Sequence, residues 1–260
     1  NGTDTTLQII GFTITSTTGG EDDGNGAVAR IYGDTYWDNN SQQDITNYSS
    51  AVFRNCIFTI FDTGSLQGQD WKDAAILVDG GISIFDNCEF TNITVDYTGY
   101  SNAARGGAVR LNGGTLRFNQ SKLTNITVKR TDGFLHGAAI GVAATQADVS
   151  LVNTIVADNL LKYTGTHIQG NGWVSGGAIY MGINSGHLKL INSTVVNNQM
   201  YTPGDYTEGG SAILINDWYG DGYTPYLTVF NSIIHSNSTV RLGGGSFETT
   251  TYNNQFSIGE

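Results

Sequence analysis

The stretch SGGAIYMGINSGHLKLINSTVVNN, residues 175–198, has close copies elsewhere in the chain. RGGAVRLNGGTLRFNQSKLTNIT occupies residues 105–127, and GGSAILIN begins at residue 209. Copies that recur every ~20 to 50 residues are typical of a solenoid, in which each copy contacts its neighbours along the stack. The repeat therefore decides how the rest of the sequence is interpreted.

Each copy contains two short apolar runs. The first follows a glycine pair or its remnant and includes one small residue: Ala75, Ala108, Ala139, Ala178 or Ala212. Apolar residues then alternate, as in Val109 and Leu111, which predicts a β-strand. The second run places Phe53, Phe85, Phe118, Leu151, Leu190 and Val229 in one apolar column, and Phe58, Phe90, Leu123, Val156, Val195 and Ile234 in another.

The order of these strands is the same in every copy, with no helical pattern between them. Stacking the copies pairs like strands in parallel and turns each apolar column into a continuous inner stack. We therefore predict an all-β fold, a right-handed parallel β-helix of about six to seven coils that forms a single domain over residues 1–260. Amide side chains in one column are expected to hydrogen-bond along the stack: Asn55, Asn87, Gln120, Asn153, Asn192 and Asn231.

Cys56 and Cys88 occupy matching positions in adjacent copies, in a column that otherwise holds serine and threonine. A disulfide is the alternative to two free thiols. Parallel side chains in register have poor geometry for that bond, so we expect buried thiols.

The composition limits the possible partners. The net charge of −11 argues against binding to nucleic acid, and no stretch is apolar enough to predict a membrane span. The chain begins at Asn1 without a methionine, which suggests a segment of a longer protein with flanking domains. We expect a secreted or cell-surface protein.

The motifs GGAVRL at 106–111 and GGAIYM at 176–181 resemble the repeats of chlamydial polymorphic outer-membrane proteins. They are also similar to the wider set of secreted right-handed parallel β-helix proteins in the pectin-lyase-like superfamily. IIGFTIT at 9–15 looks like the opening coil of such proteins, and NSIIHSN at 231–237 like the closing coil. The resemblance covers nearly the whole chain and implies the same fold. It does not specify an activity, because this fold hosts adhesins, lyases, hydrolases and stalks.

Five loops leave the second run of successive copies, and stacking would place them on one edge. Each carries an aromatic residue or histidine, and most carry a carboxylate, the chemistry that fits the apolar face and polar rim of a sugar. The candidate ligand-binding residues are Trp71, Asp73, Tyr97, Tyr100, Phe134, His136, Tyr163, Trp173, Tyr201 and Tyr206. The alternative is that these side chains pack onto their own loops.

The function predicted from this edge is adhesion through a glycan or another cell-surface ligand. A polysaccharide lyase is the alternative, with candidate basic residues Arg105, Arg110, Arg117, Lys122, Lys129 and Arg130. A glycoside hydrolase fits less well, since paired-carboxylate motifs are largely missing, and a structural stalk is the third interpretation. Catalytic residues are not identified.

A calcium site is a further expectation. Asp22 and Asp23 lie in GGEDDGNG, where glycine permits a tight turn of oxygen ligands. Solvated acidic turns are the alternative interpretation.

Overall fold

The structure is a computed structural model that describes residues 6–16, 29–32, 34–38, 43–47, 49–66, 74–97, 103–131, 133–143, 147–165, 174–182, 186–202, 212–215, 226–235 and 237–241. Every regular element in these ranges is a β-strand, so the predicted all-β class is confirmed. None of the described residues belongs to a helix long and apolar enough to cross a bilayer.

Two large parallel sheets dominate the fold. The 11-stranded sheet follows the order β1 (Thr6–Ile10), β6 (Ser50–Arg54), β8 (Ile76–Asp86), β11 (Val109–Asn119), β14 (Ile140–Val142), β19 (Ile179–Met181) and β23 (Ile213–Ile215), and it also contains β3 (Ala29–Tyr32), β15 (Asp148–Val152), β20 (His187–Ile191) and β24 (Tyr226–Phe230). The 10-stranded sheet follows the order β2 (Thr13–Ser16), β7 (Ile57–Leu66), β9 (Glu89–Tyr97), β12 (Lys122–Arg130), β16 (Ile155–Ala157), β21 (Thr194–Val196) and β25 (Ile233–His235), with β17 (Leu160–Tyr163), β22 (Gln199–Thr202) and β26 (Ser238–Arg241) off this path.

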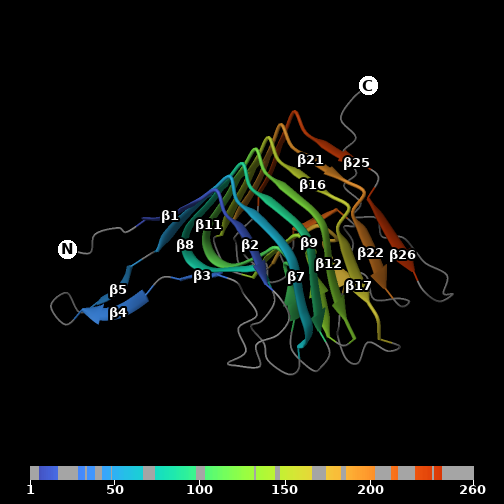
Figure 1. The fold of residues 1–260 in the computed structure, drawn as a ribbon, viewed down its shortest axis with the longest axis horizontal. Helices are drawn as coiled ribbons and strands as arrows, with labels where there is room; N and C mark the ends of the chain where they lie inside the picture. Colours follow the sequence, from blue (N-terminus) through green and yellow to red (C-terminus); the bar gives the residue numbers. More distant parts are fainter. Residues whose placement is uncertain are drawn as a thin grey trace.

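The two sheets meet along a ridge, and like strands lie side by side from the N-terminal to the C-terminal end (Figure 1). A 3-stranded parallel sheet contains β10 (Ala103–Arg105), β13 (Phe134–His136) and β18 (Val174–Ser175). The antiparallel pair β4 (Asp34–Asp38) and β5 (Gln43–Asn47) is an insertion between β3 and β6. Sheets that are parallel and not closed into a barrel are compatible with a parallel β-helix.

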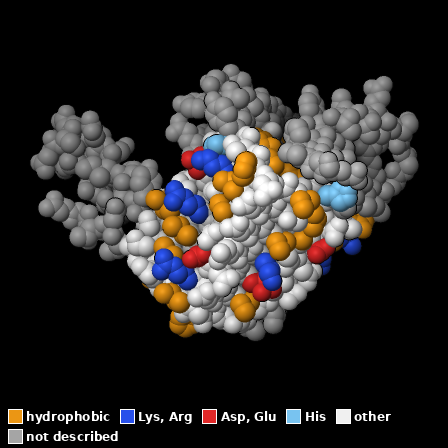
Figure 2. Space-filling model, turned by 90° about the horizontal axis from the view of Figure 1, so that it is seen from above, with side chains coloured by type: hydrophobic (Ala, Val, Ile, Leu, Met, Phe, Trp, Pro, Cys, Tyr) orange, Lys and Arg blue, Asp and Glu red, His pale blue; other side chains and the backbone are white. Residues whose placement is uncertain are grey.

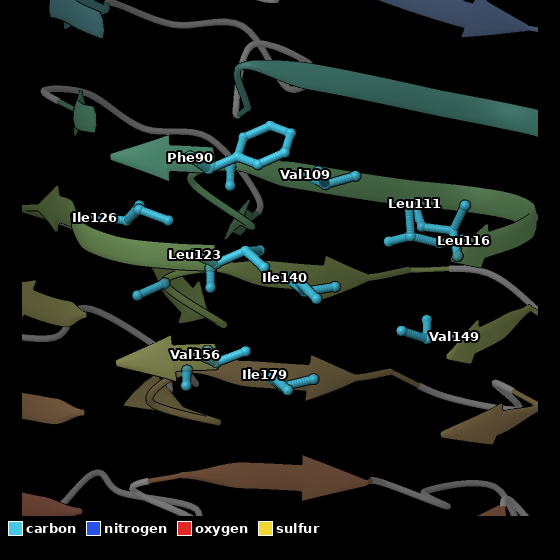
Figure 3. Close-up of a cluster of buried hydrophobic side chains, with 14 of the residues drawn as sticks. Phe90, Val109, Leu111, Leu116, Leu123, Ile126, Ile140, Val149, Val156 and Ile179 are labelled. Atoms are coloured by element: carbon cyan, nitrogen blue, oxygen red, sulfur yellow. The ribbon is translucent and has the colours of Figure 1, made fainter. Parts of the chain in front are cut away.

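The register confirms both predicted apolar columns. Phe85 pairs with Phe53 and Phe118, and the column continues through Leu151 and Leu190. The rings of Phe53, Phe85 and Phe118 stack with centroids 4.9 Å apart at each step. Figure 3 shows the second column as Phe90, Leu123 and Val156, opposite Val109, Ile140 and Ile179. The interior is therefore a continuous apolar stack built from the repeat.

The amide column lies at the ridge, where each copy of the repeat turns from one large sheet into the other. Its six members all have positive φ angles, between 46° and 54°, a conformation that asparagine tolerates better than most residues. Asn87 Nδ2 donates to Asn55 Oδ1 at 2.7 Å, and Asn231 Nδ2 donates to Asn192 Oδ1 at 2.8 Å. These two pairs confirm that amides bond along the stack, while the backbone angle explains why the column is asparagine-rich.

The cysteines are two free, buried thiols, as expected. Cys88 Sγ donates to the carbonyl oxygen of Phe53 in the preceding copy at 3.3 Å. Ser193 occupies the same column and donates in the same way to Leu151 O at 3.0 Å. The column thus holds small donors that satisfy buried carbonyl groups between copies.

A second amide ladder is buried, and the sequence analysis did not anticipate it. Asn159 and Asn198 are almost fully buried, and the Asn159 Nδ2 atom donates to Asn198 Oδ1 at 2.9 Å. Asn198 Nδ2 donates in turn to Asn237 Oδ1 at 2.8 Å. In the two preceding copies the same column holds Ile93 and Ile126. The ladder therefore replaces an apolar column with a hydrogen-bonded one in the later copies.

One repeat strand was also missed. Strand β3 pairs with the first half of β8, with Ala29 opposite Ile76 and Ile31 opposite Val78. Ile31 is buried against the core. The glycine pair that precedes most of the other copies does not precede Ala29, so only the alternation of Ala29 and Ile31 indicated this strand.

Candidate functional site

Several of the candidate residues lie outside the described part of the chain. These are Trp71, Asp73, Tyr100, Trp173, Tyr206, Asp22 and Asp23. Tyr97 is described only as the last residue of β9. Phe134, His136, Tyr163 and Tyr201 are described with their side chains, so the site is built from these four residues and their neighbours.

The predicted common edge is the end of the 10-stranded sheet from which the loops depart. Tyr97, Arg130 and Tyr163 share one register position at the ends of β9, β12 and β17. The backbone N–H of Thr164 donates to the Arg130 carbonyl oxygen at 2.7 Å, so the residues that follow β17 pack on the end of β12. For these strands, the structure places the starts of successive loops beside one another.

Tyr163 and His136 are corrections to the predicted binding set. Tyr163 is 1% exposed and His136 is 3% exposed, so neither ring presents a face to a ligand. Tyr163 lies two residues after the inward-facing Leu161 and keeps the same inward orientation, because side chains alternate along a strand. For these two residues the alternative stated above, packing onto the protein itself, is the observed one.

His136 is the centre of a buried polar cluster within the 3-stranded sheet, where it pairs in register with Ser175. Its Nδ1 atom lies 2.7 Å from Ser175 Oγ, and its ring stacks on Tyr180 with centroids 4.1 Å apart at 12°. Phe134 is half-exposed and lies 5.9 Å from the His136 ring. Two predicted residues, Phe134 and His136, are therefore neighbours, but only Phe134 reaches the surface.

Burial lowers the pKa of His136 well below its ordinary value, and the positive charges of Arg105 and Arg130 lower it further. Arg130 is fully buried, and its Nη1 atom donates to the Phe134 carbonyl oxygen at 3.0 Å. A neutral His136 avoids adding a third positive charge to this interior. The cluster is thus suited to holding β13 in place rather than to contacting solvent.

The exposed chemistry of the edge is a row of three side chains, which we call the lysine–tyrosine row: Lys129, Lys162 and Tyr201. Lys162 pairs in register with Lys129 on one side and with Tyr201 on the other. All three side chains are half-exposed, and Tyr201 OH lies 3.4 Å from Gln199 Oε1 on the same strand. The sequence analysis named Lys129 only as a basic residue and did not name Lys162, so the register is what identifies both as neighbours of the predicted Tyr201.

Of the other basic residues named for a lyase, Arg105 and Arg130 lie near the buried His136. Arg110 and Arg130 are buried, while Arg117 and Lys122 are exposed on different sheets. Figure 2 looks down on the ridge and shows basic side chains, several of them beside an acidic one, scattered among hydrophobic and neutral polar side chains. Among the described residues, no group of three or more His, Cys, Asp or Glu side chains is placed to hold a metal ion. This part of the chain offers a mixed polar and aromatic surface.

Comparisons with protein-family models, with curated proteins and with solved structures give no match to this chain. The site is therefore interpreted from its own chemistry. An aromatic ring, two ammonium groups and an amide, held in register on a rigid sheet, suit a ligand with an apolar face and a polar rim.

Proposed function

We propose that the chain is a right-handed parallel β-helix of about six to seven coils and a segment of a longer secreted or cell-surface protein. Its role is to bind a glycan or another surface ligand through the loop edge. The parallel register between copies supports the architecture. The resemblance to chlamydial polymorphic outer-membrane repeats and to secreted pectin-lyase-like proteins supports the secreted or cell-surface location.

The observation that carries the binding proposal is the position of Tyr201 and Phe134. Both are half-exposed aromatic residues: Tyr201 lies near the end of β22, and Phe134 begins β13, which follows β12. A tyrosine ring with a partner for its hydroxyl group offers a flat apolar face and little loss of side-chain freedom on binding. The rigid parallel scaffold below it supplies the preorganisation that weak glycan contacts need.

The test is a glycan array probed with the purified chain, with and without calcium. The variants Tyr201→Ala and Phe134→Ala should lose binding. Phe230→Ala is the matched control, because Phe230 is 65% exposed on β24, away from the loop edge. If the chain forms unsaturated uronate from any glycan, the binding proposal is replaced by a lyase activity. If it shows neither glycan binding nor uronate formation, the structural stalk is the remaining interpretation.

A further inference from the structure

The lysine–tyrosine row contains two like charges in direct register. Lys129 and Lys162 are adjacent on paired strands, which are about 4.8 Å apart. Like charges placed directly opposite each other in a sheet are destabilising. Within the described ranges neither lysine forms an ion pair, unlike Arg54, which lies 3.8 Å from Asp86. The contact between Lys129 and Lys162 is therefore unfavourable to folding.

Lys122 gives the contrast on the same strand. Its register partner in the preceding copy is Glu89, so opposite charges face each other there. Lys129 also faces a carboxylate, Asp96, but its other neighbour is Lys162, and beyond Lys162 lies the neutral Tyr201. Lys162, which lies next to Tyr201, therefore has no opposite charge at either of its two register positions.

Basic residues are also concentrated in this part of the chain. Residues 103–202 contain 8 Lys+Arg and 3 Asp+Glu, a formal charge of +5. The other 160 residues contain 4 and 20 respectively, a formal charge of −16. The chain is acidic as a whole, yet the copies that form the lysine–tyrosine row are basic. The formal charge of residues 103–202 is therefore opposite in sign to the net charge of −11.

We propose that the lysine–tyrosine row binds an anionic glycan whose chain runs along the stacking direction of the strands. This inference rests on the proposed function and specifies its ligand class. Lys129 and Lys162 contact acidic groups on the glycan, and Tyr201 stacks against a sugar ring beside them. An anion shared between the two ammonium groups removes the repulsion that the free protein retains.

The experiment measures the affinity of the whole chain for three probes: a carboxylated polysaccharide, a sulfated polysaccharide and a neutral polysaccharide of matched length. Each is measured at low and at physiological salt. The double variant Lys129→Gln/Lys162→Gln should weaken binding of the anionic probes about tenfold or more and reduce its salt dependence. Comparison of the carboxylated and sulfated probes shows which acidic group the row binds.

The matched control is Lys122→Gln, which removes a more exposed lysine charge from the same strand and should change the affinity less than about twofold. An equal loss in both variants would show general electrostatic attraction and overturn the inference. Binding of the neutral probe that depends on Tyr201 but not on the lysines would also overturn it while preserving the proposed function. If the wild-type chain binds none of the three probes, both this inference and the proposed function are refuted.

Discussion

Asn198 is predicted to be the most costly polar side chain to remove from the fold. It is fully buried, and its amide takes part in four hydrogen bonds. Nδ2 donates to Val156 O at 3.1 Å and to Asn237 Oδ1 at 2.8 Å. Oδ1 accepts from the backbone N–H of Asn159 at 3.2 Å and from Asn159 Nδ2 at 2.9 Å. The variant Asn198→Ala leaves all four partners without that bond.

Each lost bond costs about 1 kcal/mol, and buried groups left unsatisfied add to this, so Asn198→Ala should lower the free energy of unfolding by about 3–5 kcal/mol. Urea unfolding followed by far-UV circular dichroism measures the change. Hydrogen exchange at the Asn159 amide gives a local readout, which matters because repeat arrays do not always unfold as one unit.

The adjacent residue supplies the control. Asn197 is exposed and has a φ of 55°, an angle that glycine adopts without strain, so Asn197→Gly should change stability by less than about 1 kcal/mol. A loss below about 1 kcal/mol for Asn198→Ala, or unchanged exchange at Asn159, would refute the argument that the buried ladder holds the later copies together.

Three further predictions follow from single sites. The pKa of His136 is lowered in the fold, so the unfolded chain binds the proton first; stability should fall as the pH drops below about 6.5, and His136→Gln should flatten this dependence in melting curves between pH 7 and 5. Gly114 has a φ of 89°, and a Cβ there would overlap the Gly81 carbonyl oxygen. Gly114→Ala should therefore cost more than about 2 kcal/mol in urea unfolding, whereas the neighbouring Gly113→Ala should cost less than about 1. Burial raises the pKa of the Cys88 thiol to about 11, so a thiol reagent should modify it at neutral pH only after denaturant is added; rapid labelling of the folded chain would contradict its burial.

The inner columns could be predicted from the sequence because alternation and repetition act together. Phe53, Phe85 and Phe118 recur at the same position of each copy, and a strand sends alternate side chains to the same face. The asparagine column was predictable for the same reason. Its positive φ angles explain a preference that the sequence showed only as a pattern.

Two features could not be predicted with the same rule. The ladder through Asn159 and Asn198 replaces isoleucine with asparagine inside the core, and only the register shows that the amides satisfy one another. Tyr163 was assigned to the loop edge because of the residues that follow it. Its place two residues after Leu161 was the signal that the ring would turn inward.

The candidate site was predictable as a region but not in its chemistry. The common edge follows from stacking, whereas the pairing of Lys129 with Lys162 depends on how strands of neighbouring copies align. Insertions of different length separate the copies, so spacing along the sequence does not give that alignment directly. The basic character of residues 103–202 was hidden in the net charge of the whole chain.

The most direct test of the binding account is lysine footprinting of the wild-type chain by mass spectrometry, with and without a saturating anionic polysaccharide. Acetylation reports the accessibility of each lysine in one experiment. We predict that the ligand protects Lys129 and Lys162 and leaves Lys122 and Lys189 as reactive as in the free protein. Equal protection of all four lysines, or protection of Lys122 and Lys189 alone, would contradict binding at the lysine–tyrosine row.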